Sequence, residues 1–414
     1  MPNWSNFVNY RFNPNQELSD HDVARKGNHL EGKSIALLVT GSVAAMNSPN
    51  LARELRKYGA SVTAFVSEAA LKYGVNQNAL EWATYPNAVV TELTNASEHL
   101  KDFDAFLVAP ATANTICKVA NGIGDTVVTT TLQSALGRDK KILMAPAMHG
   151  SLHNRHLTEA VGSLYNSGVF FIAPYDAFGK HNMTDKSTIV ADVCAQTSLS
   201  NLCGVNVLVT AGPTPVKIDN VRRITNKFSG KLGVLIADEL YRQGADVHLL
   251  QSYSGIRPPR YISHRLFQDY DEYFDLVKNE FWYSTYKFGV FSAAVADYKP
   301  KEVLEGKTPS KGALKTIELT ETEKVIDWVQ SNYPELDMVT FKYEEGKTHG
   351  ELYEIAKARV DKGHLAVVAN DGSTFVDGKQ EAFIVSDSCS DLVFQGKSAI
   401  ASGVVSFLDN VLEQ

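Results

Sequence analysis

The stretch "VNVLVTAGPT" (205–214) decides the fold of the second half of the chain, since it is an apolar run that ends at Gly-Pro. After the polar loop "RRITNKFSGKLG" (222–233) comes "GVLIADELYRQG" (233–244), whose apolar residues recur at helical spacing. The next segment, "ADVHLLQS" (245–252), has the apolar character of a buried strand. Strand, helix and strand in this order predict a parallel α/β unit that is covered on both faces.

The first half of the chain has the same order of segments. An apolar strand, "SIALLVT" (34–40), is followed by "GSVAA" (41–45), by the helical pattern "SPNLARELRKYG" (48–59) and by the strand "SVTAFVS" (61–67). We therefore expect an α/β protein of two tandem Rossmann-like, three-layer domains with mainly parallel sheets. The expected divisions are an N-terminal extension, a first domain, a linker and a second domain, at residues 1–33, 34–195, 196–205 and 206–414.

Composition and charge exclude several classes of protein. The net charge of −7 over 414 residues gives nucleic-acid binding no electrostatic support. No run of about 18 apolar residues occurs, and the N-terminus lacks the pattern of a secretory signal, so we expect no membrane span. The four cysteines lie far apart and form no CxxC motif, which favours reduced thiols in a cytoplasmic protein over a disulfide framework or a zinc site.

We expect the ligand sites where the chain passes from the end of a strand into a helix. In an open parallel sheet, ligands bind beyond the carboxyl ends of the strands, where helix N-termini offer N–H groups to phosphate. Neither opening carries GxGxxG or GxxxxGK[ST], so a standard NAD site or a P-loop is not supported. Two domains of this kind predict two anionic ligands.

Four motifs of the first half occur together. These are "GSVAA" (41–45), "PATANT" (110–115), "NGIGD" (121–125) and "APAMH" (145–149). Taken alone, "PATANT" reads as a helix N-cap. Together, the motifs resemble the flavin-dependent cysteine decarboxylase family, and the second half resembles the usual fusion partner of that family. Residues 34–414 as a whole resemble the bifunctional phosphopantothenoylcysteine decarboxylase / phosphopantothenate–cysteine ligase family of coenzyme A biosynthesis.

The resemblance implies an FMN site in a flavodoxin-like first domain. The flavin would accept two electrons from the substrate thiol and return them after CO2 has left, because the cofactor carries the difficult chemistry. The residues that would bind it are Gly41, Ser42, Ser67, Ala111, Asn114 and Thr115.

The first domain departs from the family pattern at its expected catalytic positions. His99 in "ASEHLKDFDAFLVAP" (96–110) is the candidate catalytic histidine, although it lies closer to Pro110 than the family spacing. The family motif PxMN reads "PAMH" here, which makes His149 a second catalytic candidate. The segment that corresponds to the family's cysteine-bearing flap, "DAFGKHNMTDKSTI" (176–189), has no cysteine, and His181 is its reactive group. Two alternatives stay open, a cysteine-free decarboxylase or an impaired first domain.

Three histidines, His149, His153 and His156, have the spacing of one face of a helix. A zinc site would need further ligands and an ordered second shell. No nearby Cys or Glu has a suitable spacing, so we expect a surface helix that carries histidines.

The loop of the second half, "GPTPVKIDNVRRITNKFSGKLG" (212–233), resembles the nucleotide loop of the ligase family. The resemblance implies that Asn226 is catalytic and holds an acyl-cytidylate, since an amide can donate to a developing oxyanion. It also implies that five residues bind the nucleotide, namely Gly212, Asp219, Ser229, Gly230 and Lys231.

Further along, "FSAAVADYKP" (291–300) makes Asp297 a nucleotide contact and the candidate ligand of Mg2+. Lys307 in "EGKTPSKG" (305–312) corresponds to the catalytic lysine, which also binds the nucleotide, with Lys311 as the alternative. Phe341 and Lys362 correspond to further nucleotide contacts. A second family lysine falls on Ala358, so its role passes to Lys357 or Arg359.

The resemblance implies two consecutive reactions. CTP would activate 4'-phosphopantothenate as an acyl-cytidylate with the help of Mg2+, and the amine of cysteine would then form an amide. FMN-dependent decarboxylation would follow and give 4'-phosphopantetheine, in a homo-oligomer. The alternatives are a ligase with a degenerate flavin domain, a regulatory binding protein, and a two-domain NAD oxidoreductase that the missing GxGxxG disfavours.

Overall fold

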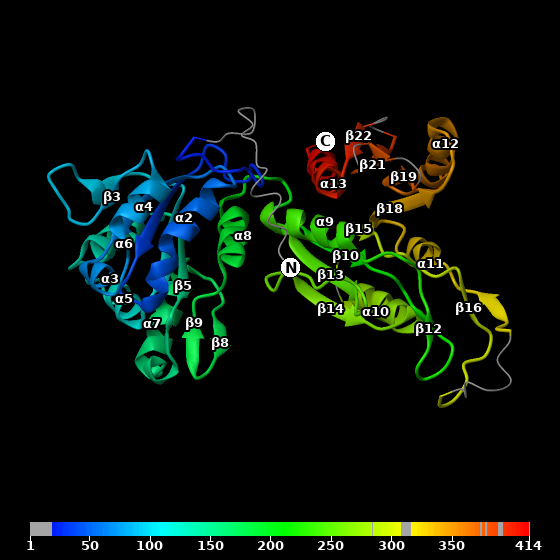
Figure 1. The fold of residues 1–414 in the computed structure, drawn as a ribbon, viewed down its shortest axis with the longest axis horizontal. Helices are drawn as coiled ribbons and strands as arrows, with labels where there is room; N and C mark the ends of the chain where they lie inside the picture. Colours follow the sequence, from blue (N-terminus) through cyan, green and yellow to red (C-terminus); the bar gives the residue numbers. More distant parts are fainter. Residues whose placement is uncertain are drawn as a thin grey trace, which may run out of the picture. The chain divides into compact units, whose positions relative to one another are not determined.

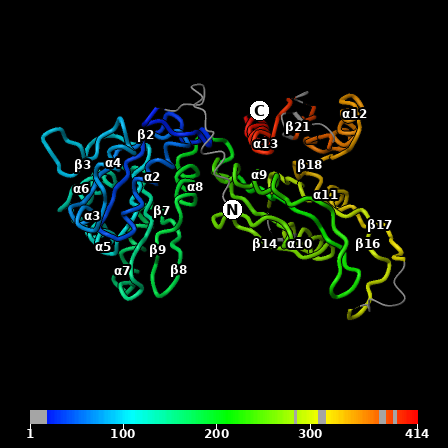
Figure 2. The backbone as a smooth tube through the Cα atoms, viewed as in Figure 1, coloured from blue at the N-terminus to red at the C-terminus, as the bar shows by residue number. Residues whose placement is uncertain are grey.

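The computed structural model describes residues 19–283, 285–307, 316–372, 375–376, 379–387 and 392–413. The chain divides into two compact units, Met1–Thr197 and Ser198–Gln414, which are described separately (Figures 1 and 2). The point of division lies within the segment predicted as the linker, residues 196–205. Lys311, the alternative to Lys307, lies outside the described residues.

The first unit is built on one sheet of parallel strands in the order of a doubly wound Rossmann sheet. In spatial order the strands are β3 (Val89–Val90), β2 (Ser61–Val66), β1 (Ser34–Val39), β4 (Ala105–Ala111), β5 (Ile142–Pro146) and β7 (Phe170–Phe171). Strand β4 continues through Pro110 and Ala111, the first two residues of the "PATANT" motif. The predicted α/β class and parallel sheet are confirmed.

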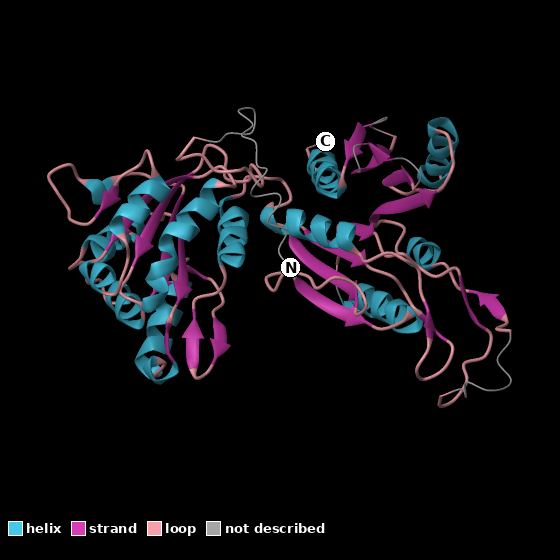
Figure 3. Ribbon diagram, in the orientation of Figure 1, coloured by secondary structure: helices cyan, strands magenta, loops and turns pink. Residues whose placement is uncertain are grey.

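Helices cover both faces of this sheet (Figure 3). Alternate side chains of β1 explain why, because Ile35 and Leu37 belong to one buried cluster, whereas Ala36 and Leu38 belong to another. The first face packs against α2 (Ser48–Arg56), α3 (Glu68–Lys72), α4 (Gln77–Thr84) and α8 (Lys186–Thr197). The second face packs against α5 (Ala113–Ala120), α6 (Val127–Leu136) and α7 (Arg155–Asn166).

The first unit also contains shorter elements outside the main sheet and its helices. The described residues of this unit include the 3-10 helices η2 (Val43–Asn47), η3 (Glu98–Leu100) and η4 (Gly150–Leu152). A small antiparallel sheet contains β6 (Met148–His149), β9 (Lys180–Asn182) and β8 (Tyr175–Ala177).

The predicted surface helix of histidines is wrong. His149 lies in β6, His153 follows η4, and only His156 lies in α7, which Asn154 caps by accepting from the backbone N–H groups of His156 and Leu157. Among the described residues, no group of three or more His, Cys, Asp or Glu side chains is placed to hold a metal ion.

The described part of the predicted extension, residues 19–33, packs against the first unit. Leu30 is fully buried in the core, and its backbone N–H donates to the Tyr58 carbonyl over 2.8 Å. The guanidinium of Arg56 donates to the His21 carbonyl over 2.6 Å. These residues therefore continue the first unit toward the N-terminus.

The second unit has a sheet with the same order of parallel strands. In spatial order they are β14 (Ser263–Phe267), β13 (Asp246–Ser252), β10 (Asn206–Ala211), β15 (Phe288–Phe291), β18 (Asp337–Glu344) and β19 (Ala366–Asp371). Three antiparallel strands extend it beyond β19, namely β21 (Lys379–Val385), β20 (Phe375–Val376) and β22 (Leu392–Gln395).

Its helices again cover both faces. Val207 and Val209 of β10 share a core with α9 (Lys231–Arg242) and α13 (Lys397–Val411). Leu208 faces the other side, with α10 (Tyr270–Tyr283) and α11 (Val325–Asn332). The remaining elements are α12 (His349–Val360) and two hairpin pairs, β11 (Val216–Lys217) with β12 (Arg223–Ile224) and β16 (Tyr298–Pro300) with β17 (Leu319–Glu321). In the part of the chain that the structure describes, we find no helix with the length and apolarity of a membrane span.

Candidate functional site

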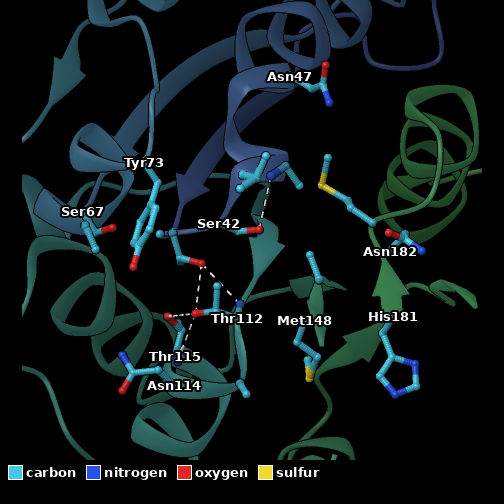
Figure 4. A pocket seen from close by; sticks show the side chains of 18 of the residues that line it. Ser42, Asn47, Ser67, Tyr73, Thr112, Asn114, Thr115, Met148, His181 and Asn182 are labelled. Carbon is cyan, nitrogen blue, oxygen red and sulfur yellow. Dashed lines mark hydrogen bonds between the residues drawn. The ribbon is translucent and has the colours of Figure 1, made fainter. Parts of the chain in front are cut away.

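The first candidate site is a cavity of about 1300 Å³ at the carboxyl ends of the strands of the first sheet. Strands β1 and β4 are neighbours, yet the chain leaves them toward helices on opposite faces. This is the switch point at which doubly wound sheets bind ligands. The loops after β1, β2 and β4 line the cavity, together with β6, β9 and the segment before α8 (Figure 4).

Among the helices that begin at this cavity, four have a hydroxyl side chain as their N-cap. The capping oxygens accept backbone N–H groups over 3.3 Å (Ser42 from Ala44), 3.3 Å (Ser67 from Ala70), 3.5 Å (Thr112 from Thr115) and 3.1 Å (Thr126 from Thr129). Helix N-termini carry partial positive charge and free N–H groups. The cavity therefore suits a ligand with an anionic group such as a phosphate.

A hydrogen bond joins the two strands of this switch point. The hydroxyl of Thr40, which follows β1, donates to the carbonyl of Pro110 in β4 over 2.7 Å. Beside it, Gly41 leaves no room for a side chain, because a Cβ there would lie 2.6 Å from the Cβ of Ala69. The backbone at Gly41 can thus lie directly at the cavity wall.

The cavity brings together most residues that were predicted to bind the cofactor. Gly41, Ser42, Ser67, Asn114 and Thr115 line it, as Figure 4 shows for the labelled side chains. Ala111 does not line it, because this residue is fully buried within β4.

The two predicted catalytic histidines lie in different places. His149 lines the cavity. His99 is not among the lining residues, since it lies in η3 beside α6. Arg138, just after α6, donates to the carbonyls of Leu100 and Lys101 and holds η3 at that end of the helix. The cavity adjoins the opposite end of α6, at Thr126.

Sequence reasoning missed several cavity residues. Thr112, Thr126 and Thr129 are lining residues that the capping pattern S/T at a helix start could have indicated. Lys118 also lines the cavity, and its ammonium lies 2.6 Å from the carboxylate of Asp125. Hydrogen bonding from Lys118 lowers the pKa of Asp125.

The second candidate site lies at the switch point of the second sheet, between β10 and β15. Three glycines bring the start of α9 against the end of β10. Gly212 (φ +90°) and Gly230 (φ +75°) adopt left-handed backbone, and a Cβ on Gly230 would lie 2.6 Å from the Gly212 nitrogen. A Cβ on Gly233 would lie 2.5 Å from the Cβ of Ala211. A Rossmann turn uses glycines for the same purposes, although here residues 213–229 separate the first from the second.

Asn226 links the loop before α9 to the end of β15 at this switch point. Its side-chain amide donates to the carbonyl of Ala294, which follows β15, over 2.7 Å. Its side-chain oxygen accepts from the backbone N–H of Phe228 over 3.2 Å. Asn226 therefore holds the loop before α9 across the end of β15, with its side chain half-buried.

The same loop reaches the end of β18. The rings of Phe228 and Tyr343 meet edge to face with centroids 5.1 Å apart, and the ammonium of Lys227 lies 3.3 Å from Glu345. Hydrogen bonds from Tyr343 and Lys227 lower the pKa of Glu345. The loop thus spans the carboxyl ends of three adjacent strands, β10, β15 and β18.

Comparison with known proteins places the chain in a family. A flavoprotein family model matches residues 23–198, and a model for the C-terminal domain of DNA/pantothenate metabolism flavoproteins matches residues 202–411. The chain is 38% identical over 372 residues to the coenzyme A biosynthesis bifunctional protein CoaBC of Thermococcus kodakarensis, covering 87% of this chain and 91% of that protein. The chain belongs to the CoaBC family.

Other relatives and structures extend the comparison. The CoaBC protein of Methanocaldococcus jannaschii is 31% identical over 395 residues, which cover 92% of this chain and 94% of that protein. The crystal structure of a DNA/pantothenate metabolism flavoprotein from Streptococcus pneumoniae is 23% identical, with a TM-score of 0.46, and covers 50% of this chain and 100% of that one. The family resemblance predicted from the sequence motifs is confirmed by the relatives.

Asp219 organises the nucleotide loop that was predicted from the family motif. Its side chain is fully buried, and its carboxylate accepts from the backbone N–H groups of Val221 and Arg222 and pairs with the Arg222 guanidinium over 3.0 Å. The adjacent segment carries Lys307, which is exposed. Leu304 donates to the Ile218 carbonyl over 3.0 Å, so the Lys307 segment lies beside the Asp219 turn.

Asp297 stands beyond the end of β15, and its exposed carboxylate pairs with the ammonium of Lys324 at the N-cap of α11. The backbone N–H of Thr322 donates to the Asp297 carbonyl over 3.0 Å. Magnesium is commonly held by one or two carboxylates together with phosphate oxygens of the substrate. A single exposed carboxylate beside a nucleotide loop fits that kind of site. Sequence reasoning missed Lys324, whose ammonium forms this ion pair with Asp297.

The remaining predicted residues lie farther along the sheet. Phe341 is half-buried in β18 on the α9 face. Arg359 donates to the Phe341 carbonyl over 3.1 Å, and burial lowers the pKa of Arg359. Lys357 instead pairs with Asp387 over 2.6 Å on the surface. Lys362 precedes β19, at the edge where the strands begin, so the structure does not bring it to the glycine loop.

Proposed function

We propose that the chain catalyses two consecutive steps of coenzyme A biosynthesis. The second domain joins 4'-phosphopantothenate and cysteine with CTP, and the first domain decarboxylates the product to 4'-phosphopantetheine with FMN. The observation that carries this proposal is the pairing of two switch-point sites, each lined by helix N-termini, in one member of the CoaBC family. A cytoplasmic location follows from such a metabolic role.

In the first domain, the FMN phosphate would sit among the capped helix N-termini. Gly41, Ser42 and Ser67 would contact it from the loops after β1 and β2. Asn114 and Thr115, at the start of α5, would lie beside the flavin, with Ala111 packed behind them. The flavin supplies two-electron chemistry at the substrate thiol. His149 at the rim would orient the substrate.

In the second domain, the N-terminus of α9 would hold the triphosphate of CTP. Ser229, Gly230 and Lys231 offer N–H groups and a positive charge there, while Gly212 lets the backbone approach. Asn226 would donate to the oxygen of the acyl-cytidylate, and the buried Asp219 would hold the loop in shape. Lys307 would stabilise charge on the leaving pyrophosphate.

Three further residues complete the ligase proposal. Asp297 would share Mg2+ with the triphosphate after exchanging its contact with Lys324. Phe341 would contact the base. Arg359, rather than Lys357, would take the place of the family lysine that is Ala358 here, because it is directed toward β18.

Two predicted residues would reach a site only if a neighbouring copy of the chain supplied it. His99 lies at the end of α6 away from the cavity, and Lys362 lies at the strand edge away from the glycine loop. Their proposed roles in decarboxylation and phosphate binding therefore support a homo-oligomer in which one copy completes the sites of another.

The experiment is mass spectrometry of the products formed from 4'-phosphopantothenate, cysteine, CTP and Mg2+. We expect 4'-phosphopantetheine. Accumulation of 4'-phosphopantothenoylcysteine would instead support the alternative, a ligase with a degenerate flavin domain. If neither product forms with CTP or with ATP, the proposed function is wrong.

A further inference from the structure

Three side chains of the first domain form a hydrogen-bonded chain at the rim of the cavity. The Nδ1 atom of His181 lies 2.6 Å from Oδ1 of Asp176, and its Nε2 atom lies 2.9 Å from Nδ1 of His153. His181 lines the cavity from β9, where Figure 4 shows it with Met148 and Asn182.

Backbone pairing fixes the geometry of this chain. In the small antiparallel sheet, His181 of β9 is the register partner of both Asp176 in β8 and Met148 in β6. His153 follows η4. The segment that carries it contacts the turn between β8 and β9, because the Gly150 N–H donates to the Gly179 carbonyl over 2.8 Å. A Cβ on Gly150 would lie 2.7 Å from that same oxygen, so only glycine permits this approach.

The contacts define where protons can lie. A carboxylate is an acceptor, so Asp176 favours a proton on Nδ1 of His181, as the acid of a catalytic triad does for its histidine. Two ring nitrogens 2.9 Å apart can hold only one proton between them, on Nε2 of His181 or on Nδ1 of His153. The chain thus holds one exchangeable proton between His181 and His153, next to the cavity.

Decarboxylation needs such a proton. The C–C bond breaks, CO2 leaves without the bonding electron pair, and that pair must finally take up a proton on carbon (RCOO− + H+ → RH + CO2). No cysteine is among the cavity-lining residues in the part of the chain that the structure describes. Histidine is the side chain whose ordinary pKa best suits proton donation near neutral pH.

We propose that His181 is the proton donor of the decarboxylation, with Asp176 and His153 as positioning residues. Substrate replaces His153 as the partner of Nε2, the proton passes from Nε2 to the substrate carbon, and His153 or solvent restores it. This inference rests on the proposed function of the first domain. With His181 as the proton donor, the reaction needs no cysteine in the segment of β8 and β9.

The test supplies 4'-phosphopantothenoylcysteine directly and measures CO2 release. We expect His181→Ala to lower kcat at least 100-fold, as general acids contribute about 10² to 10⁴, without loss of bound flavin as read from its absorbance spectrum. Added imidazole should restore part of the rate to His181→Ala, which a purely structural defect would not allow. His156→Asn, an exposed histidine outside the hydrogen-bonded chain, is the matched control and should keep the wild-type rate.

Asp176 is tested through its positioning role. Asp176→Asn should lower kcat about tenfold with unchanged KM, whereas Asp176→Glu should recover most of the rate. Wild-type CO2 release by His181→Ala, or a loss that imidazole does not relieve, would overturn the inference. A wild-type protein that releases no CO2 would instead refute the proposed function of the domain, so the two failures are distinguishable.

Discussion

The two domains have sheets with the same strand order, but they use the switch point differently. In the first domain, Ser42 starts a helical segment directly after β1, and the space beyond the strands stays open as a cavity of about 1300 Å³. In the second, residues 212–230 leave β10, form β11 and β12, and return across β15 and β18 before α9 begins. The first sheet thus leaves room for a large ligand at its switch point, whereas a loop covers the carboxyl ends of the strands in the second.

The comparison predicts that damage to one site spares the other reaction. Each domain has its own cores, and the two sites are built from separate sheets. Each variant below is therefore assayed twice, once for ligation and once for decarboxylation of supplied 4'-phosphopantothenoylcysteine.

The largest effect is expected from Asn226→Asp. A carboxylate would face the Ala294 carbonyl, 2.7 Å from the present amide nitrogen, and would remove the donor proposed for the acyl-cytidylate. Loss of one such donor costs about 10² to 10³ in kcat, and the added negative charge raises that toward 1000-fold. Asn220→Asp adds the same charge to an exposed position of the same loop and is the control. Equal losses in the two variants would exclude a specific role for the amide.

Gly230→Ala tests the glycine contact that joins α9 to β10. The left-handed backbone (φ +75°) costs an alanine about 1 kcal/mol, and its Cβ would lie 2.6 Å from the Gly212 nitrogen. The helix N-terminus must shift, and a displacement of about 1 Å can cost about 100-fold in rate. We expect that loss in ligation kinetics with normal decarboxylation.

Gly204→Ala is the matched control for this strain. Gly204 has nearly the same backbone (φ +73°) with nothing within 4 Å of a Cβ. Its variant should lose about 1 kcal/mol of stability in chemical denaturation and keep full ligase activity. If Gly204→Ala impaired ligation as much as Gly230→Ala does, the glycine contact would not be the cause.

Gly41→Ala is the corresponding change in the first domain. The new Cβ would lie 2.6 Å from the Cβ of Ala69, closer than two such carbons pack, so the cavity wall must shift. We expect flavin affinity to fall about tenfold, or ~1.4 kcal/mol, in a titration followed by absorbance, with ligation unchanged. Gly162→Ala, in α7 with open space around a Cβ, should leave flavin affinity unchanged. Parallel loss of both activities in Gly41→Ala would contradict the independence of the sites.

The sequence predicted the architecture because buried parallel strands read as apolar runs. "SIALLVT" and "VNVLVTAGPT" became the central strands β1 and β10, since both faces of each are covered. It also predicted the loops that carry Gly41, Asn114 and Gly230, because small and polar residues after such strands indicate a ligand edge.

Other features could not be read from the sequence because they depend on tertiary contacts. The meeting of Asp176, His181 and His153 needs strand register and the approach of Gly150 to Gly179. Helical spacing suggested one helix for His149, His153 and His156, but Asn154 starts α7 in their midst by capping it. Likewise, Lys324 meets Asp297 only because α11 begins beside the end of β15.

The smallest effect compares two equivalent helix caps, one in each domain. Thr126 and Thr348 each form a reciprocal capping box, with Thr129 and Glu351 respectively, but only Thr126 lines the cavity. Both Thr→Ala variants should lose about 1 kcal/mol in the free energy of unfolding. Flavin affinity should fall twofold to fivefold in Thr126→Ala alone, because an ordered helix N-terminus contributes ~0.3–1 kcal/mol to a nearby anion. An equal loss of flavin in Thr348→Ala would mean that general stability, rather than the α6 N-terminus, governs cofactor retention, and the electrostatic argument for the cavity would lose its support.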